Sequence, residues 1–443
     1  MTNTRIAGVD NPLAKMRLFR SPFTDGGNAA AAAYDALAIL HGLRQQNIVT
    51  PPYYLHIHGN WAEIGWHAAQ HIAYLDGEKS EWDTWAGALR RLGDQAGAQN
   101  TKAFGYLGFD AWDHTQGRAP DESAEFPLMQ FFIPAHRLLL TADRIEAQGI
   151  SLELLRDIAE ASRLEPNPPR RACRAVAEFP KFDYIAAVER TKRTLSHGLS
   201  KVVLSRYRSF AQETDLSVLF QDYCLGEKYA DAVLMDFGSV GAAIASPELL
   251  MGIADGAIRA NPLAGTRSLG AFEAENERIA RSLLSDRKEL AEHILALRQM
   301  MGELQPHCAP DTLTVSKLLD TARQNKVMHL SSELRGRLRE DRHCVDALLA
   351  LFPSAMVSGV PKAEAIRLIR RSEPFPRGLF GGTAGWLSGR SCRFALNIRG
   401  IYRYGQRLFV QAGAGVMAES DAARENAEVE MKMAAMLDAL AGG

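Results

Sequence analysis

The feature that most constrains the fold is the alternation of short, apolar, strand-like runs with amphipathic helical stretches along most of the chain. Lys201-Val-Val-Leu204 has the apolar, β-branched character of a buried strand. Before it, Asp183 is placed to cap a helix that carries apolar residues at helical spacing. Residues Gly400 to Gln411 are typical of a hairpin around Tyr404-Gly405-Gln406. Strands separated by helices, with hairpins among them, predict an α+β or mixed-sheet architecture.

The first third of the chain adds two strand-like runs, Phe131–Pro134 and Leu138–Thr141. They are followed by Glu165-Pro-Asn-Pro-Pro-Arg-Arg171, whose clustered prolines cannot continue a helix or a sheet. From the residues alone, this segment is the clearest candidate for a linker.

Composition and charge exclude several function classes. The 443 residues are 47% hydrophobic, which is enough for a large buried core. The 51 basic and 52 acidic residues are mixed along the chain, which argues against a nucleic-acid or membrane-surface partner. The apolar stretch Ala29 to Leu43 is too short and polar to span a bilayer, and no secretory signal opens the chain. Five scattered cysteines without a CxxC pair are typical of a cytoplasmic enzyme with reduced thiols.

Two predicted helices each carry carboxylates three residues apart. Glu289 and Glu292 share one helix face and border an apolar stripe. Glu425 and Glu428 do the same on the second helix, with Lys432 four residues beyond Glu428. Such carboxylates are costly unless paired or bound to a cation, and two facing helices of this kind can hold magnesium. Solvated helix flanks with ordinary Glu–Lys pairs are the commoner origin of this pattern.

Two further charged residues stand at the starts of apolar runs. Lys201 enters a buried strand, where loss of its proton would make it available as a base. Glu248, in Ser246-Pro-Glu248, precedes another apolar run in the same way. A lysine whose stem extends outward at a strand end is the commoner case.

Glycine-rich turns occur at Gly265, at Gly381-Gly382 and at Gly413-Ala-Gly415. Glycine lets a backbone approach a ligand, although each of these turns alone is more often only a turn. Four histidines near the start could in principle bind zinc, but no HExxH motif or nearby cysteine supports that alternative. They are His56, His58, His67 and His71.

These residues fall within the motifs of a known family. From about Asp183 to Leu440 the chain resembles the chorismate-utilising enzymes, which are the anthranilate, isochorismate, aminodeoxychorismate and salicylate synthases. Within that family it looks most like the stand-alone salicylate synthases. A weaker match at Gly105-Tyr-Leu-Gly-Phe109 extends the likeness into the first third. The matching motifs, in the family's order and approximate spacing, are Lys201-Val-Val-Leu-Ser-Arg206, Ser246-Pro-Glu248, Pro262-Leu-Ala-Gly-Thr-Arg267, Lys288-Glu-Leu-Ala-Glu-His293, Val327-Met-His-Leu330, Ser358-Gly-Val-Pro-Lys362, Arg377-Gly-Leu-Phe-Gly-Gly382 and Gln411-Ala-Gly-Ala-Gly415.

The resemblance implies a single large α+β domain, in which two mainly antiparallel sheets stack with helices outside. Residues 1–443 would then form one chorismate-binding enzyme domain. Within it, 1–170 would be a divergent N-terminal part and 175–443 the family core. The proline-rich segment would lie inside one domain.

The resemblance also implies catalytic roles. Lys201 corresponds to the base that activates water for attack at ring carbon 2 of chorismate, whereas ammonia-using members carry other residues there. Glu248 corresponds to the acid that protonates the departing carbon 4 hydroxyl, and His329 to a histidine beside the site. Base and acid on opposite sides suit attack from one side with departure from the other.

Magnesium is the implied cofactor. Glu292 and Glu428 correspond to its ligands, and Glu289 and Glu425 to the carboxylates beside or behind them. The metal would neutralise the ring carboxylate and help the hydroxyl to leave. The remaining implied substrate contacts are Gly265 and Thr266 at the ring carboxylate, Arg399, Gly413 and Gly415 at the pyruvyl group, Phe380 beneath that group, and Lys432 near the metal carboxylates.

The implied function is that of a salicylate synthase, which converts chorismate to isochorismate and then to salicylate and pyruvate. An isochorismate synthase that stops at the first product is the alternative. Two departures favour it: Phe380 stands where salicylate synthases have tyrosine, and Met356 where they tend to have threonine. An ammonia-using aminase is disfavoured by Lys201 and by the lack of a glutaminase region, so no glutaminase subunit is expected. The retained lysine, glutamates and arginine argue against a catalytically silent family member.

Overall fold

The computed structural model describes residues 29–74, 82–112, 127–141, 144–161, 172–178, 182–195, 199–225, 229, 231–324 and 327–442. The proline-rich segment 165–171 lies outside the described residues. Within the described ranges, no helix is both long enough and apolar enough to cross a membrane.

The described chain contains helices, single strands and runs of consecutive strands. The helices are α1 (Ala29–Gln45), α2 (Trp82–Ala98), α4 (Leu152–Ala161), α5 (Tyr184–Lys192), α6 (Leu216–Cys224), α7 (Glu273–Ser285), α8 (Arg287–Leu304), α9 (Cys344–Leu351), α10 (Lys362–Ser372) and α11 (Ala422–Ala441). The strands are β1 (Tyr53–His58), β2 (Trp61–Tyr74), β3 (Ala103–Leu107), β4 (Met129–Thr141), β5 (Ile145–Gln148), β6 (Ala175–Glu178), β7 (Lys201–Ala211), β8 (Asp231–Asp236), β9 (Val240–Ser246), β10 (Leu249–Ala254), β11 (Ala257–Ala260), β12 (Leu263–Ser268), β13 (Thr314–Gln324), β14 (Val327–Arg337), β15 (Gly359–Val360), β16 (Thr383–Ser388), β17 (Ser391–Leu396), β18 (Gly400–Tyr404) and β19 (Arg407–Val416).

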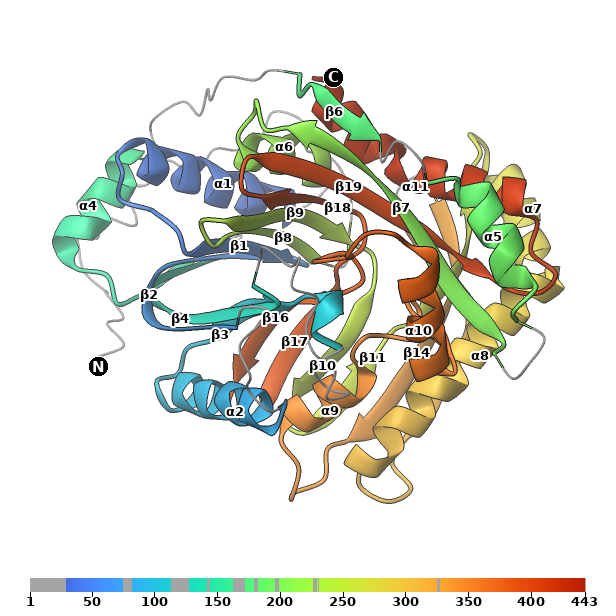
Figure 1. The fold of residues 1–443 in the computed structure, drawn as a ribbon. Coiled ribbons are helices and arrows are strands. Elements are labelled where there is room, and N and C mark those ends of the chain that lie inside the picture. The colour runs from blue at the N-terminus through green and yellow to red at the C-terminus, as the bar shows by residue number, and fades with distance from the viewer. Residues whose placement is uncertain are drawn as a thin grey trace.

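The strands form one continuous antiparallel ladder that folds into two layers (Figure 1). One layer runs in the order β7-β19-β18-β9-β8-β1-β2-β4. From β4 the ladder continues through β3-β16-β17-β10-β11-β14, and β14 also pairs with β12 and β13. A buried aromatic cluster that includes Tyr54, Phe104 and Tyr402 takes side chains from both layers. The two sheets are therefore stacked face to face.

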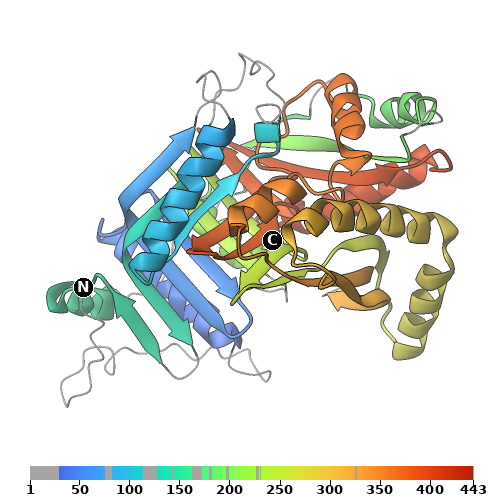
Figure 2. The same cartoon turned by 90° about the horizontal axis from the view of Figure 1, so that it is seen from below.

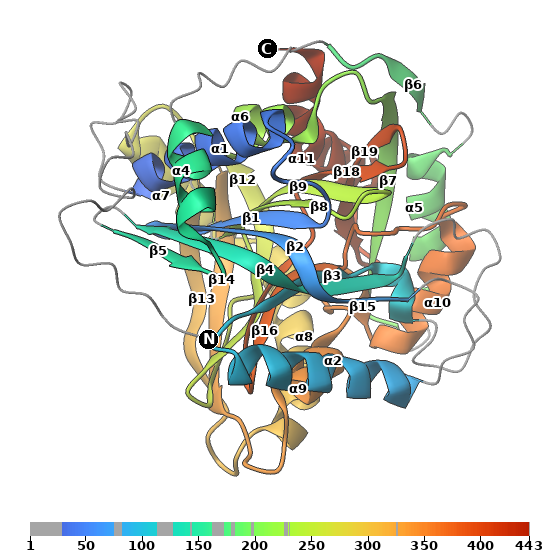
Figure 3. The same cartoon turned by 90° about the vertical axis from the view of Figure 1, so that its left-hand side faces the viewer.

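Helices cover the outer faces of both layers (Figure 3). The helices α1, α4, α5, α6, α10 and α11 contribute to one buried cluster with the first layer, which includes Leu40, Leu204 and Met433. The helices α2, α8 and α9 contribute to a second cluster with the other layer, and Figure 2 shows them lying across that face. The predicted fold class, two stacked antiparallel sheets with helices outside, is confirmed.

Several local predictions are also confirmed. Asp183 caps α5, because its carboxylate accepts a hydrogen bond of 2.9 Å from the Ala186 amide. Lys201 is the first residue of β7. The predicted hairpin is formed by β18 and β19, and Gly405 adopts the positive φ of +55° that the turn requires.

The two strand-like runs at 131–134 and 138–141 form a single strand, β4, which continues through Pro134. Proline has no amide hydrogen to donate to a ladder. The partner strand β2 has a bulge at this point, between Ala68 and Gln70, which absorbs the irregularity.

The first third of the chain contributes strands to both layers, since β1 pairs with β8 and β3 with β16. The division into 1–170 and 175–443 stays a prediction.

Candidate active site

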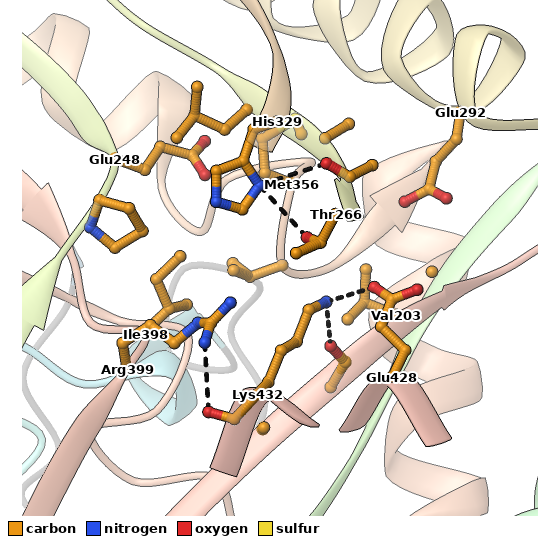
Figure 4. A pocket seen from close by; sticks show the side chains of 18 of the residues that line it. Val203, Glu248, Thr266, Glu292, His329, Met356, Ile398, Arg399, Glu428 and Lys432 are labelled. Carbon is orange, nitrogen blue, oxygen red and sulfur yellow. Dashed lines mark hydrogen bonds and ion pairs between the residues drawn. The ribbon is translucent and has the colours of Figure 1, made fainter. Parts of the chain in front are cut away.

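A cleft with about 770 Å³ of empty space, counted with its open mouth, lies between α8, α11 and the strands β7, β12, β14 and β19. A cleft into which several polar side chains converge is typical of small-molecule sites. Every predicted site residue except Lys201 and Glu425 lines it. Figure 4 shows Glu248 and His329 on one side of the cleft and Glu292 and Glu428 on the other.

Glu248 is a buried carboxyl group at the end of β9, where it follows Pro247 and is 3% exposed. Burial raises the pKa of Glu248 to about 8, although a backbone hydrogen bond from Leu263 and the charges of Lys201 and Lys432 lower it. The group therefore carries its proton at neutral pH, which is the state that a general acid needs.

His329 lies on β14 and is held by β12. Its Nδ1 is 3.2 Å from the carbonyl oxygen of Gly265 and 3.2 Å from Oγ1 of Thr266. Because a carbonyl can only accept, Nδ1 carries the hydrogen, and Nε2 is left as an acceptor. Burial, with the charge of Arg399, lowers the pKa of His329 to about 3. The imidazole is therefore neutral at neutral pH.

Arg399 and Lys432 form a cationic wall of the cleft. Arg399 has a φ of +58°, which costs a non-glycine residue about 1–2 kcal/mol and is retained only where the surroundings enforce it. Its Nη1 donates to the carbonyl oxygen of Lys432 at 3.4 Å. Lys432 donates to the Gly413 carbonyl at 2.8 Å and pairs with Glu428 at 2.7 Å. Two cations beside a cleft suit a ligand with carboxylate groups.

Lys201 lies behind Glu292 rather than in the cleft lining. Its ammonium is fully buried, 3.2 Å from Glu292 Oε1, and has no other partner in the described part of the chain. A lysine buried in this way is held by its carboxylate. The structure places the residue at the edge of the site, and its role as the base stays a prediction.

The two predicted carboxylate pairs meet across α8 and α11, and Lys288 lies between them. Its Nζ is 3.1 Å from Glu292 Oε2, 3.1 Å from Glu425 Oε1 and 3.8 Å from Glu289 Oε1. These three glutamates are 8%, 2% and 2% exposed, so the alternative of solvated helix flanks is wrong for them. Sequence reasoning gave Lys288 no role, although it stands four residues before Glu292, the spacing of a helical ion pair.

Burial and neighbouring charges compete within this cluster. Burial raises the pKa of Glu289 and of Glu425, and other carboxylates nearby raise both further. Burial alone would also raise the pKa of Glu292, but Lys201 and Lys288 lower it to about 2. In Glu289 and Glu425, nearby positive charges therefore offset the effect of burial only in part. In Glu292 they more than offset it.

Two glycines leave room for the carboxylates. A Cβ on Gly415 would lie 2.1 Å from Glu292 Oε1, which no real contact permits. Gly265 has a φ of +56°, and a Cβ there would lie 3.1 Å from Glu289 Oε2. Both positions therefore require glycine for a close approach of the backbone.

The donor set of the cluster fits magnesium, which prefers carboxylate oxygens and water. Glu425 Oε2 is buried and accepts no hydrogen bond from the described residues, so it is available to a cation. In the described ranges, no three His, Cys, Asp or Glu side chains already converge on one point. The Lys288 ammonium lies between the Glu292 and Glu425 carboxylates.

Sequence reasoning missed the buried pair of Arg377 and Glu373. Arg377 donates at 2.6 Å to Glu373, at 2.6 Å to the Val203 carbonyl and at 2.7 Å to the Val357 carbonyl. Glu373 also accepts from the Ser205 amide at 2.7 Å. The pair therefore ties β7 to the loop that forms the cleft wall. Its signal was the four-residue spacing of the two side chains.

Phe380 and Met356 form an apolar part of the cleft wall, at 3% and 9% exposure. The Phe380 ring centroid lies 5.7 Å from the Arg377 guanidinium, within cation–π range. Neither side chain offers a hydroxyl to a ligand.

Comparisons with known proteins place this geometry in a family. The model of the chorismate binding enzyme family matches residues 50–438. Over 220 residues the chain is 39% identical to anthranilate synthase component 1 of Mycolicibacterium smegmatis, a match that covers 49% of this chain and 41% of that protein. The chain therefore matches less than half of that relative's length.

Two solved structures share the fold. Anthranilate synthase component I from Streptococcus pneumoniae superposes with a TM-score of 0.74 at 24% identity, over 86% of this chain and 92% of that chain. The menaquinone-specific isochorismate synthase from Escherichia coli gives a TM-score of 0.71 at 23% identity, over 91% of each chain. Because the family model spans most of the chain, from the first strand to the last helix, this protein belongs to the chorismate binding enzyme family.

Proposed function

We propose that this protein adds water to chorismate to form isochorismate and then eliminates pyruvate to release salicylate. The observation that carries the proposal is the buried, protonated Glu248, which faces a cleft with a cationic wall and a carboxylate cluster. The resemblance to stand-alone salicylate synthases supports the second step and stays a prediction.

In the first step, the oxygen of water bonds to ring carbon 2 as the double bonds shift and the carbon 4 hydroxyl departs. Glu248 supplies the proton that lets this hydroxyl leave as water, since it holds a proton up to about pH 8. Lys201 takes the proton of the attacking water. It must be neutral for this role.

The remaining residues bind and orient the substrate. Arg399 is suited to a bidentate grip on the pyruvyl carboxylate. The Thr266 hydroxyl and the backbone at Gly265 lie beside the proposed ring carboxylate position, next to neutral His329. Lys432 holds the Gly413 carbonyl and so fixes the floor of the cleft.

The residues that would hold magnesium are Glu292 and Glu428, with Glu289 and Glu425 beside them. When bound, the metal would supply Lewis-acid neutralisation of the ring carboxylate.

The second step needs positioning more than acid or base. The hydrogen on carbon 2 passes to the methylene carbon of the enolpyruvyl group, the carbon 3–oxygen bond breaks, and pyruvate leaves as the ring becomes aromatic. Arg399 and the backbone from Gly413 to Gly415 would hold the side chain over the ring for this transfer.

A second candidate is an isochorismate synthase that stops after the first step. It is favoured by the wall of Phe380 and Met356, which offers the pyruvyl group no hydroxyl bond. The loss of one such bond is worth about 1 kcal/mol.

The relatives named anthranilate synthase form an aminated product, so the reaction should also be tested with ammonium. We propose that this chain uses water and works without a glutaminase subunit. Purified protein should be incubated with chorismate and magnesium, with and without ammonium, while salicylate fluorescence and pyruvate are followed. Salicylate with equimolar pyruvate supports the proposal, and isochorismate without pyruvate supports the second candidate. Anthranilate in the ammonium arm would overturn both.

A further inference from the structure

The ammonium of Lys288 lies inside the carboxylate cluster, which consists of Glu289, Glu292, Glu425 and Glu428. Its two contacts of 3.1 Å join Glu292 on α8 to Glu425 on α11. The Lys288 side chain is 18% exposed, so part of it reaches solvent although its charge is surrounded by carboxylates. A single lysine thus bridges the two helices that carry the cluster.

Lys201 contacts the same cluster from the opposite side. Glu292 lies between the two lysines, with Oε1 3.2 Å from Lys201 and Oε2 3.1 Å from Lys288. Lys201 is fully buried within β7, whereas Lys288 lies in the first turn of α8 and has a path to solvent. Of these two lysines, Lys288 is the one whose flexible stem can leave the cluster without disturbing a strand.

We propose that Lys288 is a built-in counter-ion that occupies the divalent-cation position and is displaced when the cation binds. The inference rests on the proposed function only in taking the carboxylate cluster as a cation site. Glu292 is a proposed magnesium ligand, and the Lys288 ammonium already lies 3.1 Å from its Oε2. Magnesium requires ligand oxygens at about 2.0–2.1 Å, so an ion that took this oxygen would leave no room for the ammonium. Binding of the ion must therefore expel Lys288 toward solvent.

This exchange has two physical consequences. Without a cation, the ammonium keeps four neighbouring carboxylates from repelling one another, which preserves the packing of α8 against α11. With a cation, the lysine competes for the same oxygens. If the ammonium occupies the position for 90–99% of the time, the apparent affinity for the cation falls by about ten- to a hundredfold.

The test measures cation binding directly, in the full-length protein and without substrate. Mn²⁺ serves as the probe, and its free concentration is read by electron paramagnetic resonance, with Mg²⁺ as competitor. Lys288→Met removes the ammonium and keeps the stem. Arg298→Met is the matched control, because it removes one positive charge from an exposed position of the same helix. We expect Lys288→Met to bind Mn²⁺ at least about tenfold more tightly than Arg298→Met.

Thermal unfolding supplies a second readout. Lys288→Met should unfold at a lower temperature than the control without cation, and should gain more stability than the control when Mg²⁺ is added. If Lys288→Met does not fold in either condition, Lys288→Gln carries the same predictions, since it removes the charge and keeps a hydrogen-bond donor. Mn²⁺ binding by these neutral variants that is equal to or weaker than that of Arg298→Met would overturn the inference.

The outcome is separable from that of the proposed function. Tighter Mn²⁺ binding by Lys288→Met, in a protein that forms no isochorismate, would support the counter-ion role of Lys288 and contradict the proposed function. Absence of Mn²⁺ binding in the native protein and in both neutral variants would contradict both the counter-ion role of Lys288 and the proposed magnesium site.

Discussion

Glu248 and Glu292 are both buried glutamates of the same cleft, yet the pKa of Glu248 is about 8 and that of Glu292 is about 2. Burial acts on both carboxyls in the same direction, because it disfavours the charged form. The difference is the contact with cations. Glu292 has an ammonium within 3.2 Å of each of its oxygens, whereas Glu248 interacts with Lys201 and Lys432 only at longer range.

The comparison shows how one cleft can keep a proton on one side and a negative charge on the other. The Glu248 side is suited to proton donation, and the Glu292 side to cation binding. Two side chains of the same type acquire opposite charge states at neutral pH from their neighbours. Changes to those neighbours are therefore the sharpest way to test the comparison.

The largest effect is expected from removal of Lys201. Lys201→Ala should reduce isochorismate formation by about 10³- to 10⁴-fold, the upper part of the range for a lost acid–base group. It should keep the fold, as read by circular dichroism. Lys192→Ala, at a lysine that pairs with Glu189 on α5, is the control and should act like the native protein. Turnover by Lys201→Ala close to the native rate would remove the water-activation role.

A smaller loss of activity is expected when Glu248, on the opposite side of the cleft, is replaced by a residue without an acidic proton. Glu248→Gln keeps the size of the side chain but cannot donate the required proton, so kcat should fall by about 10²- to 10³-fold. KM should change little, since the side chain is neutral in both proteins. Exposed Glu419→Gln is the matched control. A fall in kcat/KM that came only from a higher KM would mean that Glu248 binds substrate rather than protonates it.

A change at the proposed magnesium site should alter the Mg²⁺ concentration that activity requires. Glu428→Gln should raise the Mg²⁺ concentration needed for half-maximal rate by about ten- to a hundredfold, the range seen when metal-site interactions are weakened. Glu430→Gln, on the same helix but paired with Arg206 and Arg208, should leave that requirement unchanged. An equal shift in both variants would indicate a general effect of charge on α11.

The pH dependence gives the mildest test. As the proposed general acid, Glu248 would act in its protonated form. Its pKa is raised to about 8, so kcat/KM should hold up to that pH and then fall. The fall should approach tenfold per pH unit, as for the loss of one proton. In Glu248→Gln this alkaline limb should disappear. A native profile that stays flat or rises from pH 8 to pH 9 would contradict the assignment.

Local periodicity and turn chemistry predict a mixed α and β architecture, the strand at Lys201, the cap at Asp183 and the hairpin after Gly400. The stacking of two antiparallel sheets was expected only from the family resemblance. The sequence also indicates two helices with carboxylates beside an apolar stripe. It does not predict that Lys288 lies between those helices, since that depends on how α8 and α11 face each other. The link from Arg377 to the Val203 carbonyl is missed for the same reason: the two residues are 174 positions apart. The joining of the runs 131–134 and 138–141 into one strand, β4, was missed because the bulge opposite Pro134 lies on another strand.

In the proposed reaction, water attacks ring carbon 2 of chorismate. Turnover in ¹⁸O-labelled water, with magnesium and ammonium both present, tests it most directly, with products identified by mass spectrometry. We expect one ¹⁸O atom in the carbon 2 hydroxyl of isochorismate and, after pyruvate elimination, in the phenolic hydroxyl of salicylate. An aminated product, or a carbon 2 hydroxyl without the label, would contradict it.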